Sequence, residues 1–472
     1  MKKKYKLSIV PSSGLLILIA SIFIPVSIFM AISLENTYLW LCLAISIFIT
    51  VIFDALISKA RLSKIYIIFP NIIRLSKGKE GIVNVFIQNT DDLKLIVRVG
   101  IGFPKEIIPL TYDIKITIDK SIDKSNDSQF SINWPCIAIK QGYFLMEECY
   151  VETLSFIGLW NIRGLFKGIT EIRVYPNLHN ESKKVKQLLS KNNIGYHLIR
   201  QIGKGKDFEQ LREYMEGDSY DDICWKATAK RMKPVTKVYQ IEKTQNIYLA
   251  IDNSRLSSRI LGRINLPQTY LDSEPYMENF ILNTSILQKY IECSLVMGAI
   301  IQKQGDMFGL IVFSDRVKKF IKAKNGKTHY NACMDLVYTL DHEEVNPDYS
   351  ELFSFIGTNI RRRSLIIVLT NLDDALMAEN FIKTSKIIKN KHIIIANMLK
   401  SSNTHPLFMP SNPIQTIDEV YSHLAGHFLW ANLKNIEKIL NQHGIGFSML
   451  KEDTMSIELI SQYFSVKQRQ AL

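Results

Sequence analysis

The stretch "IYLAIDNSRL", residues 247–256, decides the fold of the second half of the chain. An unbroken apolar run leads into Asp252, and Ser254 follows two positions later. Near-continuous apolar strands are typical of parallel sheets whose two faces are both covered by helices. The stretch therefore predicts a buried parallel strand. It leaves two interpretations of Asp252: a ligand for a divalent cation, or a cap for the backbone N–H groups that follow.

Strand and helix patterns alternate on both sides of this stretch, from residue 246 to residue 472. The expected strands cover 246–252, 307–315, 362–371, 392–399 and 444–450, and the expected helices cover 281–305, 330–342, 378–391, 418–442 and 455–467. This alternation predicts a doubly wound α/β domain. Ligands of such sheets bind outside the carboxyl ends of the strands, where Asp252 and Asn371 are expected.

A different pattern occupies residues 65–176, where apolar residues recur at every second position. In "LKLIVRVGIGF", residues 93–103, alternate side chains from Leu95 to Phe103 fall on one face. Short alternating runs separated by turn-rich segments predict an all-β, immunoglobulin-like sandwich of roughly seven strands. Trp134 and Trp160 are interpreted as core or edge aromatic residues of this sandwich.

The first 64 residues are the most apolar part of the chain. The runs 14–34 and 38–57 each have about the 20 residues that a helix needs to cross a bilayer. Lysines precede the first run, and Lys59, Arg61 and Lys64 follow the second. The pattern predicts a two-helix transmembrane hairpin in the bacterial inner membrane, with both termini and the bulk of the chain in the cytoplasm. A cleaved signal peptide is the alternative, but a second apolar run follows at once.

Charge and cysteine content agree with a cytoplasmic location beside a membrane. The formal net charge of the 472 residues is +13, and the six cysteines include no Cys-x-x-Cys pair. Reduced thiols are typical of cytosolic proteins. Excess positive charge favours contact with the anionic cytoplasmic leaflet of the lipid bilayer. Nucleic acid is not an expected partner, because no zinc finger, RNP-like pattern or clear helix-turn-helix is present.

A connector, residues 177–245, joins the two folded parts and contains the most distinctive block of the sequence. This block reads "FEQLREYMEGDSYDDICWKATAKR", residues 208–231. It resembles the hallmark of the bacterial domain-of-unknown-function family numbered fifty-eight, whose members are membrane-anchored proteins with a von Willebrand factor A-like domain. The matching residues are Arg212, Glu213, Tyr214, Gly217, Asp218, Trp225, Lys226 and Ala229. Asp222 departs from the family, which often has arginine there.

The resemblance implies partners rather than a reaction. Members of the family are often encoded beside MoxR-type AAA+ ATPases, with which they are thought to assemble or mature other proteins. The chain is accordingly expected not to be an enzyme. A hydrolase would need a nucleophile with a base or a complete metal shell, and the sequence shows neither.

A-like domains bind Mg²⁺ through Asp-x-Ser-x-Ser, a threonine from a later loop and an aspartate after another strand. Here Asp252 and Ser254 fill the first two positions, but Leu256 fills the third. Asn371 stands where the second aspartate is expected, and Thr328 is a loosely placed candidate for the threonine. With a carboxylate and a hydroxyl replaced, Mg²⁺ is possible but no cofactor is expected.

These observations leave two functional hypotheses. The favoured one is a membrane-anchored scaffold or adaptor whose A-like domain binds a protein, with the AAA+ ATPase as the expected partner. The alternative is an Mg²⁺-dependent receptor that uses Asp252, Ser254 and Asn371. The hallmark block also has two interpretations: a docking surface, or a brace in which Arg212 pairs with Asp218 and Trp225 packs inward.

Overall fold

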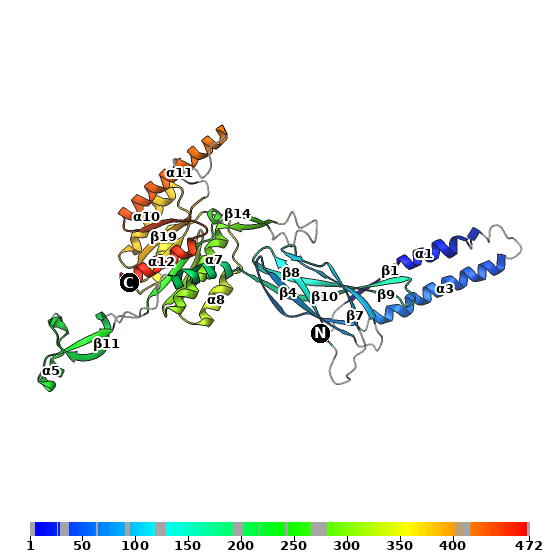
Figure 1. Ribbon diagram of the computed structural model, residues 1–472, viewed down its shortest axis with the longest axis horizontal. Coiled ribbons are helices and arrows are strands. Elements are labelled where there is room, and N and C mark those ends of the chain that lie inside the picture. Colours follow the sequence, from blue (N-terminus) through cyan, green and yellow to red (C-terminus); the bar gives the residue numbers. More distant parts are fainter. Residues whose placement is uncertain are drawn as a thin grey trace. The chain divides into compact units, whose positions relative to one another are not determined.

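A computed structural model of the chain forms two compact units, Met1–Tyr175 and Pro176–Leu472 (Figure 1). Each unit is described by itself. The structure describes residues 5–25, 27–28, 37–62, 65–89, 95–118, 129–191, 202–216, 218–240, 244–265, 281–401, 404, 406 and 416–469.

The first unit contains the two-sheet sandwich that the alternating pattern predicts. The larger sheet has the order β1-β10-β9-β5-β7, with β3 also paired to β10, and the smaller sheet has the order β2-β4-β8-β6. Its strands are β1 (Tyr5–Pro11), β2 (Ile65–Ile68), β3 (Ile72–Ser76), β4 (Glu80–Asn89), β5 (Leu95–Gly102), β6 (Ile107–Pro109), β7 (Asp113–Ile118), β8 (Gln129–Ala138), β9 (Gly142–Leu154) and β10 (Trp160–Tyr175).

Alternate side chains of both sheets fill one core between them. Val97 and Val99 of β5 and Val83 and Val85 of β4 are fully buried, as the period of two requires. Trp134 lies in this core and donates its indole N–H to the carbonyl of Thr111 at 2.6 Å. A buried indole needs such an acceptor, so the interpretation of Trp134 as a core residue is confirmed.

The N-terminal segment differs from the prediction. Residues 5–11 form β1, which pairs antiparallel with β10, so part of the expected basic flank belongs to the sandwich. The first apolar run then forms α1 (Ser13–Leu18) and a short π-helix (Ile19–Phe23), and the second lies in α3 (Thr37–Leu62). The link at residues 35–37 lies largely outside the described residues.

No helix among the described residues is both long and apolar enough to span a membrane. The transmembrane hairpin predicted for residues 1–64 is therefore not supported. Two contacts tie α3 to the sandwich instead. Asp54, which is buried, accepts a hydrogen bond from the backbone N–H of Ile157 at 3.1 Å. Trp160 donates its indole N–H to the carbonyl of Val51 at 3.0 Å.

The second unit is the predicted doubly wound α/β domain. Its six-stranded sheet has the order β17-β16-β13-β18-β19-β20, and only β17 runs antiparallel to its neighbour. These strands are β13 (Asn246–Asp252), β16 (Met307–Phe313), β17 (Val317–Lys324), β18 (Leu365–Leu369), β19 (Ile393–Leu399) and β20 (Gly446–Leu450).

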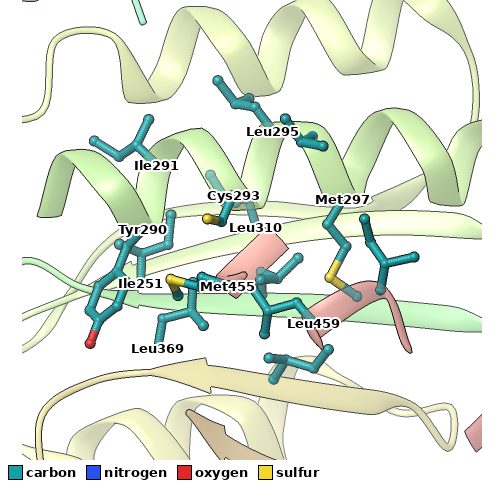
Figure 2. Close-up of a cluster of buried hydrophobic side chains, with 14 of the residues drawn as sticks. Ile251, Tyr290, Ile291, Cys293, Leu295, Met297, Leu310, Leu369, Met455 and Leu459 are labelled. Atoms are coloured by element: carbon teal, nitrogen blue, oxygen red, sulfur yellow. The ribbon is translucent and has the colours of Figure 1, made fainter. Parts of the chain in front are cut away.

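Helices cover both faces of this sheet. One face packs against α4 (His179–Lys191), α7 (Ile286–Lys303), α8 (Lys327–Val337) and α12 (Met455–Gln468), and the other against α9 (Tyr349–Asn359), α10 (Ala375–Lys389) and α11 (Ile417–Gln442). Figure 2 shows the first of these two cores, in which Tyr290, Cys293 and Met297 of α7 and Leu459 of α12 lie over the central strands, which contribute Ile251 and Leu369.

The helix α4 belongs to this domain, although the sequence placed it in the connector 177–245. Glu181 of α4 is buried and accepts hydrogen bonds from Lys289 of α7 at 3.0 Å and from Ser456 of α12 at 2.6 Å. Burial alone would raise the pKa of Glu181, but the Ser456 hydroxyl and the Lys289 ammonium outweigh it, so the pKa is lowered. A charged carboxylate thus fixes α4 to two other helices.

The remainder of the connector forms a small hairpin of its own. It consists of β11 (Ile202–Glu213) and β12 (Val235–Gln240), joined through the short helix α5 (Trp225–Arg231). This hairpin carries the hallmark block.

The carboxyl edge of the sheet as a candidate binding site

Three parallel strands of the second unit end side by side. Asp252 is the last residue of β13 and pairs in register with Phe313 of β16, while Ile251 pairs with Leu369 of β18. The loops that follow these strands therefore meet at one edge of the sheet. This carboxyl edge is the place where sheets of this kind bind their ligands.

Asp252 is fully buried at this edge, and both of its carboxylate oxygens accept hydrogen bonds. Oδ1 accepts from the backbone N–H of Ser254 at 2.9 Å, and Oδ2 accepts from the hydroxyl of Thr370 at 2.6 Å. The Thr370 hydroxyl also lies 3.0 Å from the hydroxyl of Tyr349, another buried residue. Burial raises the pKa of the Asp252 carboxyl, and the hydrogen bonds from Thr370 and Ser254 offset only part of that rise.

Ser254 has a local structural role. It is the N-cap of a 3-10 helix, Arg255–Ser258, and its Oγ accepts from the backbone N–H of Leu256 at 3.4 Å. Asp252 and Ser254 together hold the turn that follows β13, as the capping interpretation predicts. Leu256 offers no oxygen from its side chain, so the third position of the motif contributes nothing.

Asn371 lies at the edge beside Asp252 and is 5% exposed. Its Nδ2 lies 3.4 Å from Oδ2 of Asp373, which also forms an ion pair with Arg259 at 2.6 Å. Its Oδ1 is buried and accepts no hydrogen bond from any residue that the structure describes. Asp374 caps α10 through the backbone N–H of Leu376. The two aspartates after Asn371 therefore already have partners.

Thr328 is not at this edge, so its prediction as a metal ligand is wrong. It lies in the first turn of α8, directly after β17. Because β17 runs antiparallel, its end pairs with the beginning of β16: Lys324 is opposite Phe308. Thr328 is therefore near the amino ends of the parallel strands, whereas Asp252 is at their carboxyl ends.

The motif residues at the carboxyl edge fit Mg²⁺ poorly. The ion requires hard oxygen ligands in near-octahedral geometry. Asp252 is the only carboxylate of the motif, and its oxygens already accept from Ser254 and Thr370. No group of three or more histidine, cysteine, aspartate or glutamate residues suited to a metal occurs within the described ranges.

An acidic loop, residues 341–348, completes the edge, and its position was not recognised from the sequence. The backbone N–H of Glu343 donates to the carbonyl of Asn253 at 2.9 Å, and that of Arg255 donates to the carbonyl of Val345 at 3.1 Å. The Glu343 carboxylate accepts from Ser314 at 2.9 Å and pairs with Lys318 at 3.0 Å. The acidic loop is therefore packed on the turn after β13 and presents carboxylates at this edge.

The hallmark block combines features of both interpretations made from the sequence. Arg212 donates to Asp218 at 2.6 Å, so the predicted ion pair of the brace is present, and Asp218 also accepts from the backbone N–H of Met215 at 3.0 Å. Tyr214 stacks on Tyr220 with ring centroids 6.0 Å apart. Trp225 is 70% exposed, so its predicted inward packing is wrong.

The other hallmark residues are placed as follows. Glu213, at the end of β11, lies 3.4 Å from the ammonium of Lys233. Lys226 and Ala229 belong to α5. Gly217 lies outside the described residues. Large apolar side chains are exposed around this turn: Met215, Tyr220, Trp225 and Met232.

The sheet order, the antiparallel edge strand and the aspartate at the end of the first parallel strand are those of a von Willebrand factor A-like domain. Residues 284–407 match the family profile described as "Protein of unknown function DUF58". This match over residues 284–407 confirms the family predicted from the sequence. The matched segment begins after the hallmark block.

Solved structures are similar to the chain at low identity. The VWA domain of SpRpn10 is 11% identical over 46% of this chain and 95% of that chain, with a TM-score of 0.26. BatB, a conserved hypothetical protein from Bacteroides thetaiotaomicron, is 12% identical over 48% of this chain and 99% of its own, with a TM-score of 0.29.

An aerotolerance-related membrane protein from Bacteroides fragilis is 11% identical over 47% of this chain and 98% of its own, with a TM-score of 0.25. A search of curated proteins gave no match. The fold assignment therefore rests on the sheet order and the strand directions.

Proposed function

We propose that the chain is a protein-binding adaptor whose A-like domain recognises its partner at the carboxyl edge without a metal ion. One observation carries this proposal: both oxygens of the Asp252 carboxylate already accept hydrogen bonds from within the domain. The carboxylate therefore holds the turn after β13. Because Leu256 and Asn371 stand at two other positions of the motif, it is also the only charge that the motif could offer a cation. Recognition then falls to the surface around it, in particular to the packed acidic loop 341–348.

The partner we propose is a MoxR-type AAA+ ATPase, and the place of action is the inner face of the cytoplasmic membrane. The family resemblance supports the ATPase. The apolar composition of residues 14–34 and 38–57 and the net charge of +13 support association with an anionic membrane surface. The adaptor has no catalytic role in this proposal.

The exposed side chains of the hallmark block support a second contact with the partner. Tyr220 follows a turn that the Arg212–Asp218 pair holds, and Trp225, the first residue of α5, is exposed as well. Exposed tryptophan and tyrosine on a rigid support are typical of residues that dominate protein interfaces. We therefore assign docking to these aromatic side chains and bracing to the ion pair beneath them.

Co-purification of the full-length chain with the MoxR-type ATPase encoded nearest to it tests the proposal. We expect a complex that survives a chelator, because no metal participates. Reversing the charge of the acidic loop, through Asp341→Lys and Glu344→Lys, should weaken the complex. Glu147→Lys, at an exposed position of β9 in the sandwich, serves as the charge-reversal control. Failure to recover the ATPase with the unaltered chain would contradict the proposed partner.

A magnesium-dependent receptor is the competing function, and the unpartnered Oδ1 of Asn371 is the observation in its favour. Calorimetric titration of the full-length chain with Mg²⁺ separates the two functions. The adaptor predicts no saturable heat and an Asp252→Asn variant that still binds the partner. The receptor predicts saturable Mg²⁺ binding that Asp252→Asn abolishes.

A further inference from the structure

The helix α11 is much longer than the strands on which it packs. Its 26 residues extend about 39 Å, whereas the five residues of β20 extend about 17 Å. Of its buried residues, Leu433, Ile436 and Leu440 lie in the second half of the helix, and Gly426 lies before the midpoint. Because α11 leads directly into β20, its first turns extend beyond the carboxyl edge of the sheet. Figure 1 shows this half of α11, in orange, projecting from the second unit.

The projecting half carries an exposed apolar stripe on the side away from the core. The stripe consists of Ile417, Val420, Tyr421, Leu424 and Phe428, each at least 40% exposed. On a helical wheel the centre of the stripe lies roughly 140–170° from Leu433 and Leu440 and roughly 100° from Ile436. A surface helix normally has polar residues on that side. The core of the second unit does not cover this stripe, so we expect another surface to bind it.

A lipid surface does not fit this stripe. Helices that lie in a membrane interface carry lysine and arginine on their polar face. Residues 417–430 contain neither lysine nor arginine, but they contain Asp418 and Glu419, in a chain whose net charge is +13. An anionic leaflet would repel this end of the helix.

A second copy of the helix fits poorly as well. Five such side chains offer roughly 500 Å² of apolar surface, whereas a stable interface buries ~800 Å² per partner. A groove that encloses the helix adds contact from its rims and reaches that area. The spacing i, i+3, i+4, i+7 and i+11 is the pattern by which an amphipathic helix enters a hydrophobic groove.

We propose that residues 417–428 of α11 insert into an apolar, helix-binding groove of another protein, whose rim carries basic side chains facing Asp418. The inference goes beyond the proposed function, because it does not depend on the partner being an ATPase. The helix is already folded and anchored through Leu433, Ile436 and Leu440, so little conformational entropy is lost when it docks.

Site-specific photo-crosslinking of the full-length chain in its native host tests the proposal. A benzoylphenylalanine residue replaces Phe428, and in a separate control it replaces Ile387, an exposed apolar residue of α10. We expect one discrete adduct with another protein from position 428, with crosslinked residues that mass spectrometry places in an apolar groove. That adduct should be absent from position 387 and lost when Leu424→Ser is added.

An adduct with a second copy of the chain, an adduct with lipid only, or no adduct at position 428 would each overturn the proposal. An adduct with a protein that is not an ATPase would agree with the proposed groove for α11. It would contradict only the MoxR-type ATPase as the partner. With the mapped partner purified, Phe428→Ser should weaken binding about tenfold or more, and Ile387→Ser should change it by less than about twofold. Equal effects of the two variants would also overturn the proposal.

Discussion

The hydroxyl of Thr370 donates a 2.6 Å hydrogen bond to Oδ2 of Asp252, and this contact joins the ends of β13 and β18. The bond is buried and is continued to Tyr349. It ties the carboxylate of Asp252 to the hydrogen-bond network of the domain itself.

Thr370→Val should therefore destabilise the domain. The variant keeps the shape of the side chain but leaves Oδ2 of a buried carboxylate without its donor, at a cost of about 1–3 kcal/mol. Urea unfolding of the full-length chain measures the change. Thr370→Ser, which retains the hydroxyl, is the matched control and should lose less stability. A Val variant as stable as the original chain would show that the hydrogen bond is unimportant.

The stability that Asp252 contributes should fall as pH rises. Burial raises its pKa in the folded state above the ordinary value of 3.8, so between these two values the folded state binds more protons than the unfolded state. The free energy of unfolding then decreases with increasing pH in that window. In Asp252→Asn this decrease is absent, so the stability of the variant relative to the original chain should improve from pH 4 upward.

The measurement is a series of urea unfolding curves for both proteins across that pH range. A stability difference that is independent of pH, or that changes in the opposite direction, would mean that Asp252 is charged without penalty in the folded state. A cation bound nearby would produce that result.

The attachment of α4 should depend on the Glu181–Lys289 ion pair. Both side chains are less than a tenth exposed. Lys289→Met leaves a buried carboxylate without its nearest buried cation and should cost about 3 kcal/mol. Lys184, which contacts the same carboxylate at 3.1 Å but is 38% exposed, provides the control. Lys184→Met should cost less than about 1 kcal/mol.

Hydrogen exchange on α4 shows where the loss occurs. In Lys289→Met, the backbone amides of residues 182–191 should exchange faster than they do in the original chain. Exchange in the central strands should stay the same. Because the pKa of Glu181 is lowered in the folded state, its stabilising contribution is present above the ordinary value of 4.5 and is lost as pH falls. Uniform acceleration over the whole domain would contradict a local role for the pair.

Much of the fold could be predicted from the sequence because its signals are local. The apolar run that ends at Asp252 defined a buried parallel strand, and the alternation around Val97 and Val99 defined a sandwich strand. Thr328 was misplaced because its location depends on the direction of β17, a strand with intermediate burial and many lysines that lacks the apolar run of its neighbours. The direction of an edge strand is a property of tertiary pairing.

The candidate site was predicted only in part for the same reason. Asp252 and Asn371 follow strands that the apolar pattern reveals, so their meeting at one edge follows from parallel pairing. The donor that occupies Asp252 is Thr370, a residue inside the apparent strand, and its role appears only when two strands are placed side by side. The acidic loop had no signal beyond its composition, because its packing depends on backbone contacts with Asn253 and Arg255.

Trp225 and Arg212 should separate docking from bracing in the hallmark block. Trp225→Ala removes a side chain that is 70% exposed, so the free energy of unfolding should change by less than about 0.5 kcal/mol. Binding of the partner should nevertheless weaken by about 2 kcal/mol, as expected for an exposed aromatic residue that an interface buries. Arg212→Met breaks the pair with Asp218 and should loosen the turn before Tyr220, whose side chain we also assign to docking. Hydrogen exchange at residues 213–216 should then rise in the Arg212 variant and remain unchanged in the Trp225 variant, while both lose affinity. The opposite outcome would be that Trp225→Ala unfolds the hairpin and leaves the affinity of the remaining folded protein unchanged. Trp225 would then be a bracing residue, because a docking side chain stabilises the complex whereas a bracing side chain stabilises the fold.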